Sequence, residues 1–210
     1  MRVQASRIVP IVLLVVTVLL AASCATRRPL RGQEVDGFDK KLSTYAFIEE
    51  GDLVTLIVDT RAARDKDGRK YVPLEIAIAN HGMRVLALTR ESFTLLDAAG
   101  NRYPVASPRE LLEGYEMLDF DRNLAEIEGI TFNRFAAMAR YPSNFSPTRT
   151  VQAGLGDNLV QDYVGLPRHG YIIDFIYFPA PSTGILNQPF ELFVDSPSLD
   201  EPVFVKFEVR

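Results

Sequence analysis

Cysteine and histidine are scarce in this chain of 210 residues, which contains one cysteine, Cys24, and two histidines, His81 and His169. A single thiol cannot form an internal disulfide, and it cannot supply a metal site built from several cysteines. A catalytic or metal-binding role for either histidine needs partners from elsewhere in the fold, so we interpret both as ordinary loop residues. We therefore expect no metal and no cofactor.

Basic residues are fewer than acidic ones. The chain has 23 Lys and Arg residues and 27 Asp and Glu residues, which gives a net charge of −4. An acidic balance argues against a nucleic-acid partner. The sequence contains no Gly-x-Ser-x-Gly elbow, no Gly-x-x-x-x-Gly-Lys loop and no His-Glu-x-x-His motif. We expect a protein that is not an enzyme. The alternative is a hydrolase that uses two of the carboxylates, because spacing in the sequence does not show whether two of them lie across a cleft.

The apolar segment at residues 8–23 has 16 residues, which is fewer than the roughly 20 that a membrane-spanning helix needs. Arg2 and Arg7 precede this segment, and three small residues separate it from Cys24. A basic start, a short apolar stretch and a small-residue exit are typical of a secretory signal peptide. We predict that residues 1–23 are such a signal. An uncleaved membrane anchor and a plain cleaved signal that leaves a free thiol are the alternatives.

The end of this segment, Leu20-Ala21-Ala22-Ser23-Cys24, resembles the lipobox of bacterial lipoproteins. The resemblance implies that Cys24 is the first mature residue and carries a diacylglyceryl thioether with an amide-linked acyl chain. Two or more acyl chains hold a protein stably on a bilayer. Ala25, in place of an aspartate, favours by analogy the periplasmic face of the outer membrane in a Gram-negative envelope.

Residues 24–42 are rich in charge and also contain glycine and proline, without a sustained period, so we predict a flexible tether. Its root-mean-square reach is roughly 20–25 Å, which keeps the following domain near the membrane. Arg27, Arg28 and Arg31 either touch anionic head groups or remain solvated.

Residues 43–210 are predicted to form a single, mainly β domain. Apolar alternation and β-branched runs predict strands at 53–58, 72–79, 93–97, 171–178, 190–194 and 203–210. The polar segment 64–70 contains Asp67-Gly68 and predicts the tip of a hairpin between the first two strands. Short strands separated by turns are typical of an antiparallel β-sandwich.

A helical segment is predicted to interrupt the strands at 107–142. Ser107-Pro108-Arg109-Glu110 has the residues of a capping box, and apolar residues then recur at helical spacing until Pro142, which predicts a helical hairpin. The segment and its exit are rich in aromatic residues, namely Phe120, Phe132, Phe135, Tyr141 and Phe145. If the segment packs flat on the sheet, these residues are core. If it stands off as a lid, they line a groove for an apolar ligand or a partner peptide.

Residues 71–105 contain a strand that ends in Asn80-His81-Gly82, followed by Phe93-Thr94-Leu95-Leu96-Asp97-Ala98-Ala99-Gly100-Asn101-Arg102-Tyr103. This pattern resembles the immunoglobulin-like modules of bacterial lipoproteins of the DUF4352 type. The resemblance implies an immunoglobulin-like sandwich with the helical segment inserted into it. We expect a binding or assembly module that contacts another envelope protein. The alternative is a carrier or chaperone of an apolar ligand under the insert.

Overall fold

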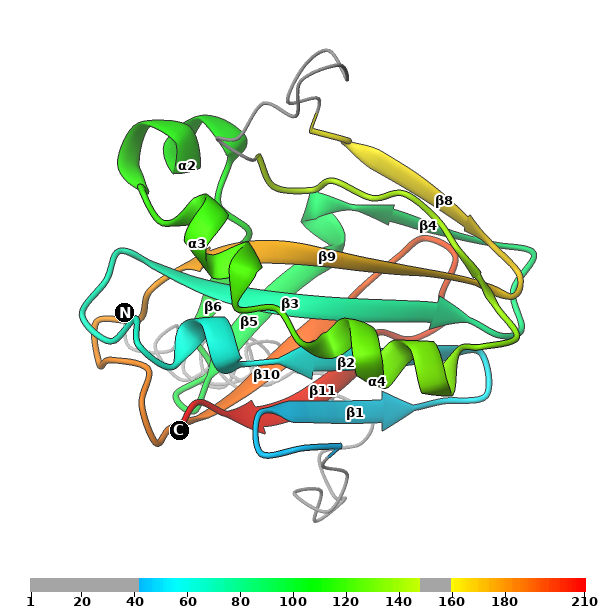
Figure 1. Ribbon diagram of the computed structural model, residues 1–210, viewed down its shortest axis with the longest axis horizontal. Helices are drawn as coiled ribbons and strands as arrows, with labels where there is room; N and C mark the ends of the chain where they lie inside the picture. Colours follow the sequence, from blue (N-terminus) through cyan, green and yellow to red (C-terminus); the bar gives the residue numbers. More distant parts are fainter. Residues whose placement is uncertain (1–41, 148–159) are drawn as a thin grey trace, which may run out of the picture. The chain divides into compact units, whose positions relative to one another are not determined.

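The computed structural model describes residues 42–147 and 160–210, all within the compact unit Gly37–Arg210 (Figure 1). The predicted signal peptide, Cys24 and nearly all of the tether lie outside the described residues. Every helix of the described part is too short or too polar to span a bilayer.

The chain is mainly β, as predicted, and its strands form several sheets. The largest sheet has the order β1 (Ala46–Glu50), β2 (Val54–Asp59), β3 (Tyr71–Asn80), β9 (Gly170–Pro179), β7 (Ala139–Arg140). The second sheet has the order β11 (Val203–Glu208), β10 (Pro189–Val194), β5 (Phe93–Asp97), β6 (Arg102–Pro104), and a third pairs β4 (Val85–Thr89) with β8 (Tyr163–Pro167). All strand pairs are antiparallel except β7 and β9.

One apolar core joins the three sheets. Successive side chains of a strand point to opposite faces, so residues of β3 that are two apart, such as Leu74 and Ile76, share one face. The apolar residues of this face share a core cluster with Leu192 of β10 and Phe207 of β11, and they are Val72, Leu74, Ile76 and Ile78. Leu86 of β4 belongs to the same cluster. The core therefore lies between the sheets, and it positions the loops at both ends of the strands.

The predicted hairpin of β2 and β3 is present, and Asp59 lies opposite Glu75 in its register. Its connection is not a purely polar tip, because a short 3-10 helix, η1 (Arg61–Ala63), and the buried side chain of Lys66 form part of it. A second 3-10 helix, η2 (Arg90–Ser92), joins β4 to β5.

The insert contains three short helices, α2 (Pro108–Gly114), α3 (Leu118–Asn123) and α4 (Ile127–Arg134), instead of the predicted helical hairpin. The predicted capping box is present, since the Ser107 side chain accepts from the Glu110 N–H and Glu110 Oε2 accepts from the Ser107 N–H at 2.9 Å. The last helix ends well before Pro142. Ala139 belongs to β7, where its N–H donates to the carbonyl of His169 and the sheet edge satisfies the backbone.

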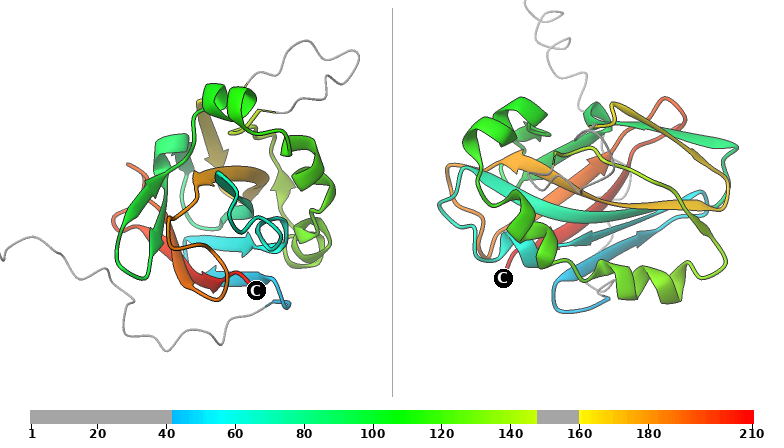
Figure 2. Two further views of the ribbon diagram at one scale, coloured as in Figure 1. Left: turned by 90° about the vertical axis from the view of Figure 1, so that its left-hand side faces the viewer. Right: turned by 45° about the horizontal axis from the view of Figure 1, so that its top comes forward.

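The helices cover the outer face of the five-stranded sheet (Figure 2). Leu111, Tyr115 and Leu118 pack on Phe175 and Tyr177 of β9. Further along, a second group packs the last helix on the sheet, and it comprises Ile48, Ile57, Ala77, Ala79, Ile127, Phe135 and Tyr171. As a result β3 is buried along its whole length, whereas its alternating sequence predicts one solvated face.

The turn between β5 and β6 explains the pattern from Phe93 to Tyr103. Asp97 accepts hydrogen bonds from the backbone N–H groups of Ala99 and Asn101, from Asn101 Nδ2 and from the hydroxyl of Tyr103. Gly100 adopts a φ of 81°, a left-handed conformation that glycine reaches without strain. Burial opposes ionisation of Asp97, but these hydrogen bonds outweigh it and lower the pKa of the carboxyl.

We expect Asp97→Ala to lower the free energy of unfolding by about 2–3 kcal/mol, because it removes four hydrogen bonds and leaves their donors to find new partners. Urea denaturation measures the change. The exposed neighbour Arg102 provides the control, and Arg102→Ala should stay within about 0.5 kcal/mol of the wild type. Equal stabilities of the two variants would show that the turn does not depend on Asp97.

Candidate functional site

The five aromatic residues predicted to line a groove fall into two groups in the structure. Phe135 and Phe145 are buried, with 3% and 0% of their surface exposed. Phe120, Phe132 and Tyr141 are 51%, 71% and 36% exposed. The first group belongs to the core and the second to the surface.

The structure does not bring these five residues together. Phe145 packs on Phe93 with ring centroids 5.4 Å apart. Phe135 packs on Tyr171 at 5.3 Å, in a different cluster. The Lys66 ammonium lies 5.0 Å from the ring centroid of Phe120. Binding of a ligand or a partner peptide by these aromatic residues stays a prediction.

The helical segment is attached to the β2–β3 connection by a buried ion pair. Lys66 Nζ lies 2.9 Å from Asp121 Oδ1, and their side chains are 3% and 0% exposed. The Tyr115 hydroxyl donates to Asp121 Oδ2 at 2.7 Å. Burial raises the pKa of Asp121, while Tyr115 and Lys66 act in the opposite direction. The cluster carries opposite charges in contact and therefore fixes α3 in position.

A second buried polar group lies at the start of α4. Glu75 Oε2 accepts the backbone N–H groups of Glu126 and Ile127, both at 3.2 Å. Glu75 and its cross-strand neighbour Asp59 are 4% and 2% exposed. Asp59 Oδ1 accepts the Arg61 N–H at 2.7 Å, while among the described residues Oδ2 has no hydrogen-bond partner. Burial raises the pKa of Glu75 to about 7, and the charge of Asp59 adds to this effect.

A third buried carboxyl, Asp174, holds the segment that follows β7. Asp174 Oδ2 accepts the Phe145 N–H at 2.8 Å, and Arg122 Nη2 donates to the carbonyl of Ser146 at 2.9 Å. Burial raises the pKa of Asp174, while the Phe145 N–H and the Arg122 charge oppose the increase. The Lys66–Asp121 pair attaches the insert to the β2–β3 connection, while Glu75 and Asp174 attach the insert and its exit to the large sheet.

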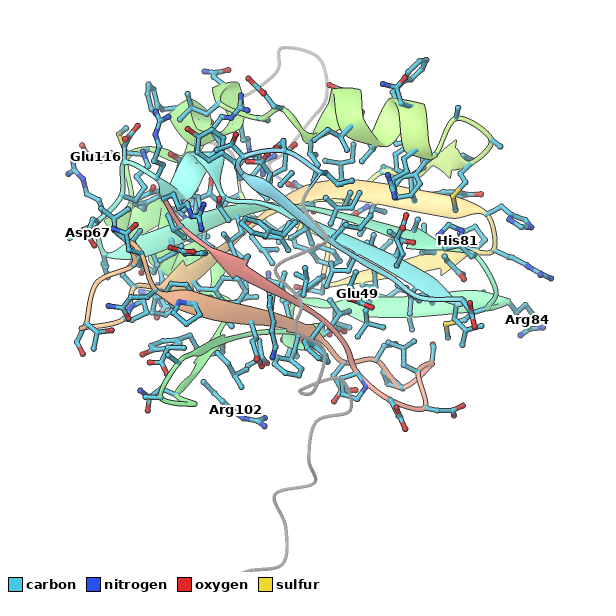
Figure 3. All side chains as sticks on the ribbon, turned by 90° about the horizontal axis from the view of Figure 1, so that it is seen from below. Glu49, Asp67, His81, Arg84, Arg102 and Glu116 are labelled. Atoms are coloured by element: carbon cyan, nitrogen blue, oxygen red, sulfur yellow. The ribbon has the colours of Figure 1, made fainter. Side chains whose placement is uncertain are left out.

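Surface loops gather at the end of the strands where β1 and β3 finish. The N–H of His81 donates to the carbonyl of Leu53 at 2.8 Å, which joins the β3–β4 turn to the β1–β2 turn. The N–H of His169 donates to the carbonyl of Asn80 at 2.7 Å, which adds the β8–β9 turn. Figure 3 shows His81 and Arg84 at this end and Asp67 and Glu116 at the opposite end. We call this surface, formed by the turns at 51–53, 81–84 and 168–169, the loop end.

The loop end is held by a buried amide. Asn80 is fully buried, and its Nδ2 donates to the carbonyls of Met83 and Leu166 while its Oδ1 accepts the Met83 N–H. His81 Nε2 lies 2.8 Å from Thr55 Oγ1. These bonds connect β3, the β3–β4 turn and β8, so the loop end is ordered before it meets any ligand.

The opposite end has an open hollow of about 600 Å³ between the β2–β3 and β9–β10 connections. Its lining residues run from Asp67 to Lys70 and from Pro179 to Ile185. Asp67 Oδ1 accepts the Ile185 N–H at 3.0 Å and ties the two connections together. Within residues 42–147 and 160–210, no group of three His, Cys, Asp or Glu side chains is arranged to hold a metal ion.

Comparison with known proteins adds no relative. No family model matches the chain. No curated protein and no solved structure matches it either.

Proposed function

We propose that this protein is a lipid-anchored component of the bacterial cell envelope that presents an immunoglobulin-like binding or assembly module. The observation that carries this proposal is the sequence Leu20-Ala21-Ala22-Ser23-Cys24 at the end of a short apolar segment with a basic start. Acyl chains on Cys24 would anchor the mature chain, and residues 25–42 would connect the anchor to the domain. The preferred location is the periplasmic face of the outer membrane.

The β-rich domain supports a binding role because its sheets share one core and hold several surface turns in fixed positions. Binding residues are often found on turns that a rigid scaffold positions. The alternative carrier function has less support, since Leu111, Leu118 and Ile127 fill the space between the helices and the sheet.

Lipidation is tested with Cys24→Ala in the full chain. We expect the variant to keep its leader and to lose the acyl mass that intact-mass analysis detects on the wild-type protein, because the thioether has no sulfur atom to form on. Ser23→Ala leaves the cysteine and a small preceding residue in place, so it should be lipidated like the wild type. An unmodified thiol in the wild-type protein would contradict the proposal.

The membrane assignment is tested separately by density fractionation. We expect the wild-type protein in the outer-membrane fraction and Ala25→Asp in the inner-membrane fraction, by analogy with the retention signal of bacterial lipoproteins. Recovery of the lipidated wild-type protein in the inner-membrane fraction would contradict the outer-membrane location.

A further inference from the structure

The loop end combines exposed apolar and cationic side chains from separate turns. Leu53 is 49% exposed on the β1–β2 turn and Val85 is 39% exposed at the start of β4. Tyr141 is 36% exposed and its ring lies so close to Gly170 that a Cβ there would come within 2.9 Å of it. Tyrosine is enriched at protein interfaces, and a central apolar contact with a polar surround is their usual composition.

Two arginines of this surface have no ion-pair partner among the residues that the structure describes. Arg168 is exposed and its Nε donates to the carbonyl of His81 at 3.1 Å, which positions it beside the β3–β4 turn that carries exposed Arg84. By contrast, Arg134 and Arg140 nearby are paired with Glu50 and Glu128. Asp52 is the only carboxylate within residues 51–53, 81–84 and 168–169, so Arg84 and Arg168 give the loop end a net charge of +1 in a protein that is acidic overall.

His169 is a third exposed polar residue of the loop end. It is exposed and has a φ of 61°, a left-handed conformation that glycine adopts at lower energetic cost. Its N–H bonds to Asn80 and its carbonyl accepts from Ala139, so the surrounding structure enforces this conformation. The exposed His169 side chain is therefore held in a fixed position on the loop end.

The composition of the loop end favours an acidic protein segment as its partner. The exposed guanidinium groups of Arg84 and Arg168 complement carboxylates. The exposed side chains of Leu53 and Tyr141 offer apolar contacts of the kind that protein interfaces bury.

We propose that the loop end binds an acidic segment of another envelope protein, with Arg84 and Arg168 pairing with its carboxylates and Leu53 and Tyr141 contacting its apolar side chains. Guanidinium groups bind carboxylates with two parallel hydrogen bonds, and arginine and tyrosine dominate the binding energy of many interfaces. The inference rests on the proposed function as a binding module and adds the surface and the chemistry of the partner.

The charge preference is tested with the full chain in detergent and a fluorescent peptide of alternating glutamate and leucine. Fluorescence anisotropy should detect binding of this peptide, and Arg84→Glu combined with Arg168→Glu should weaken binding by at least about tenfold. The matched control is Arg102→Glu, an exposed arginine on β6 away from the loop end (Figure 3), which should bind like the wild type. Thermal unfolding of each variant verifies that the domain remains folded.

Three results of this experiment would overturn the inference. One is equal or tighter binding of a lysine–leucine peptide. Another is equal affinity of the double variant and Arg102→Glu for the acidic peptide. The third is binding to phosphatidylglycerol vesicles that requires Arg84 and Arg168, combined with no binding of the acidic peptide. That result would assign the surface to the membrane.

Photocrosslinking in intact cells separates this inference from the proposed function. A photoreactive residue at Arg84 or His169 should give a discrete protein adduct whose crosslinked peptide is acidic, and the same residue at Arg102 should not. If a photoreactive residue at Phe132, on α4, gives adducts and one at Arg84 gives none, the protein is still a binding module. The assignment of binding to the loop end is then overturned. No adduct from any position, with Cys24 shown to be lipidated, would overturn the binding function itself.

Discussion

Replacing Lys66 by methionine is expected to lower the free energy of unfolding by about 3–5 kcal/mol, because it leaves the Asp121 carboxylate buried without its cation. The ammonium lies 2.9 Å from Asp121 Oδ1, and both side chains are almost completely shielded from water. The Tyr115 hydroxyl continues to donate to Asp121 Oδ2 but brings no charge. Urea denaturation at neutral pH measures the loss.

The pair Arg109 and Glu113 provides the matched control for this prediction. It is also an ion pair at 2.8 Å, but its side chains are 85% and 65% exposed, and Arg109→Met should cost no more than about 0.5 kcal/mol. A double variant, Lys66→Met with Asp121→Leu, removes both charges and should be more stable than Lys66→Met alone. Equal effects of Lys66→Met and Arg109→Met would show that burial of the ion pair is not maintained in solution.

Glu75→Gln is expected to change how stability depends on pH. The pKa of Glu75 is raised from 4.5 to about 7 in the folded protein, primarily by burial. As pH rises from about 4.5 to 7, the unfolded chain releases the proton of this carboxyl while the folded chain retains it. Between pH 4.5 and pH 7 this single carboxyl therefore lowers the free energy of unfolding progressively, by a total of about 3 kcal/mol. Above pH 7 its contribution no longer changes with pH.

Glutamine is neutral at every pH and keeps an oxygen that can accept from the N–H groups of Glu126 and Ile127. We expect Glu75→Gln and the wild type to differ little at pH 4 and the variant to be more stable at pH 8. The difference between the two proteins separates this carboxyl from Asp174, whose pKa is also raised by burial, and it includes the interaction of Glu75 with Asp59. Glu113→Gln on the exposed face of α2 should follow the wild-type profile. A difference that is constant with pH would contradict the prediction.

Both predictions concern the attachment of the helical segment to the large sheet. The ion pair fixes α3 through Asp121, and Glu75 accepts from the first turn of α4. Buried charged groups contribute little net stability when paired, yet the loss of one partner is costly. The segment is therefore expected to adopt a single arrangement on the sheet.

Local patterns predicted several elements well. The alternation in β3 and β11, the β-branched run of β2 and the capping box at Ser107 all depend on neighbours within a few residues. The strands β1, β4 and β8 were not predicted. Their strand conformation depends on pairing, of β1 with β2 and of β4 with β8, rather than on a pattern in their own sequences.

The buried charged groups could not be located by the same reasoning. Lys66 follows two charged residues in a segment with the composition of a solvated turn, and Asp121 lies among charged neighbours. A partial signal was present at Asp174, because a single carboxyl interrupts a strand that is apolar on both faces. Such a residue needs partners inside the protein. The Phe175 N–H is adjacent in the sequence, but the second partner, the Phe145 N–H, is 29 residues away.

The amino-acid sequence alone determined the mainly β class, the capped start of the helical segment and the prediction of lipidation at Cys24, because each follows from residues adjacent in the chain. Only the tertiary structure decided that the insert packs flat on the sheet, that Phe135 and Phe145 are core, and that the loop end gathers Arg84, Arg168 and His169. Burial and electrostatic pairing depend on distances in space between remote residues, and those distances are set when the sheets and helices pack.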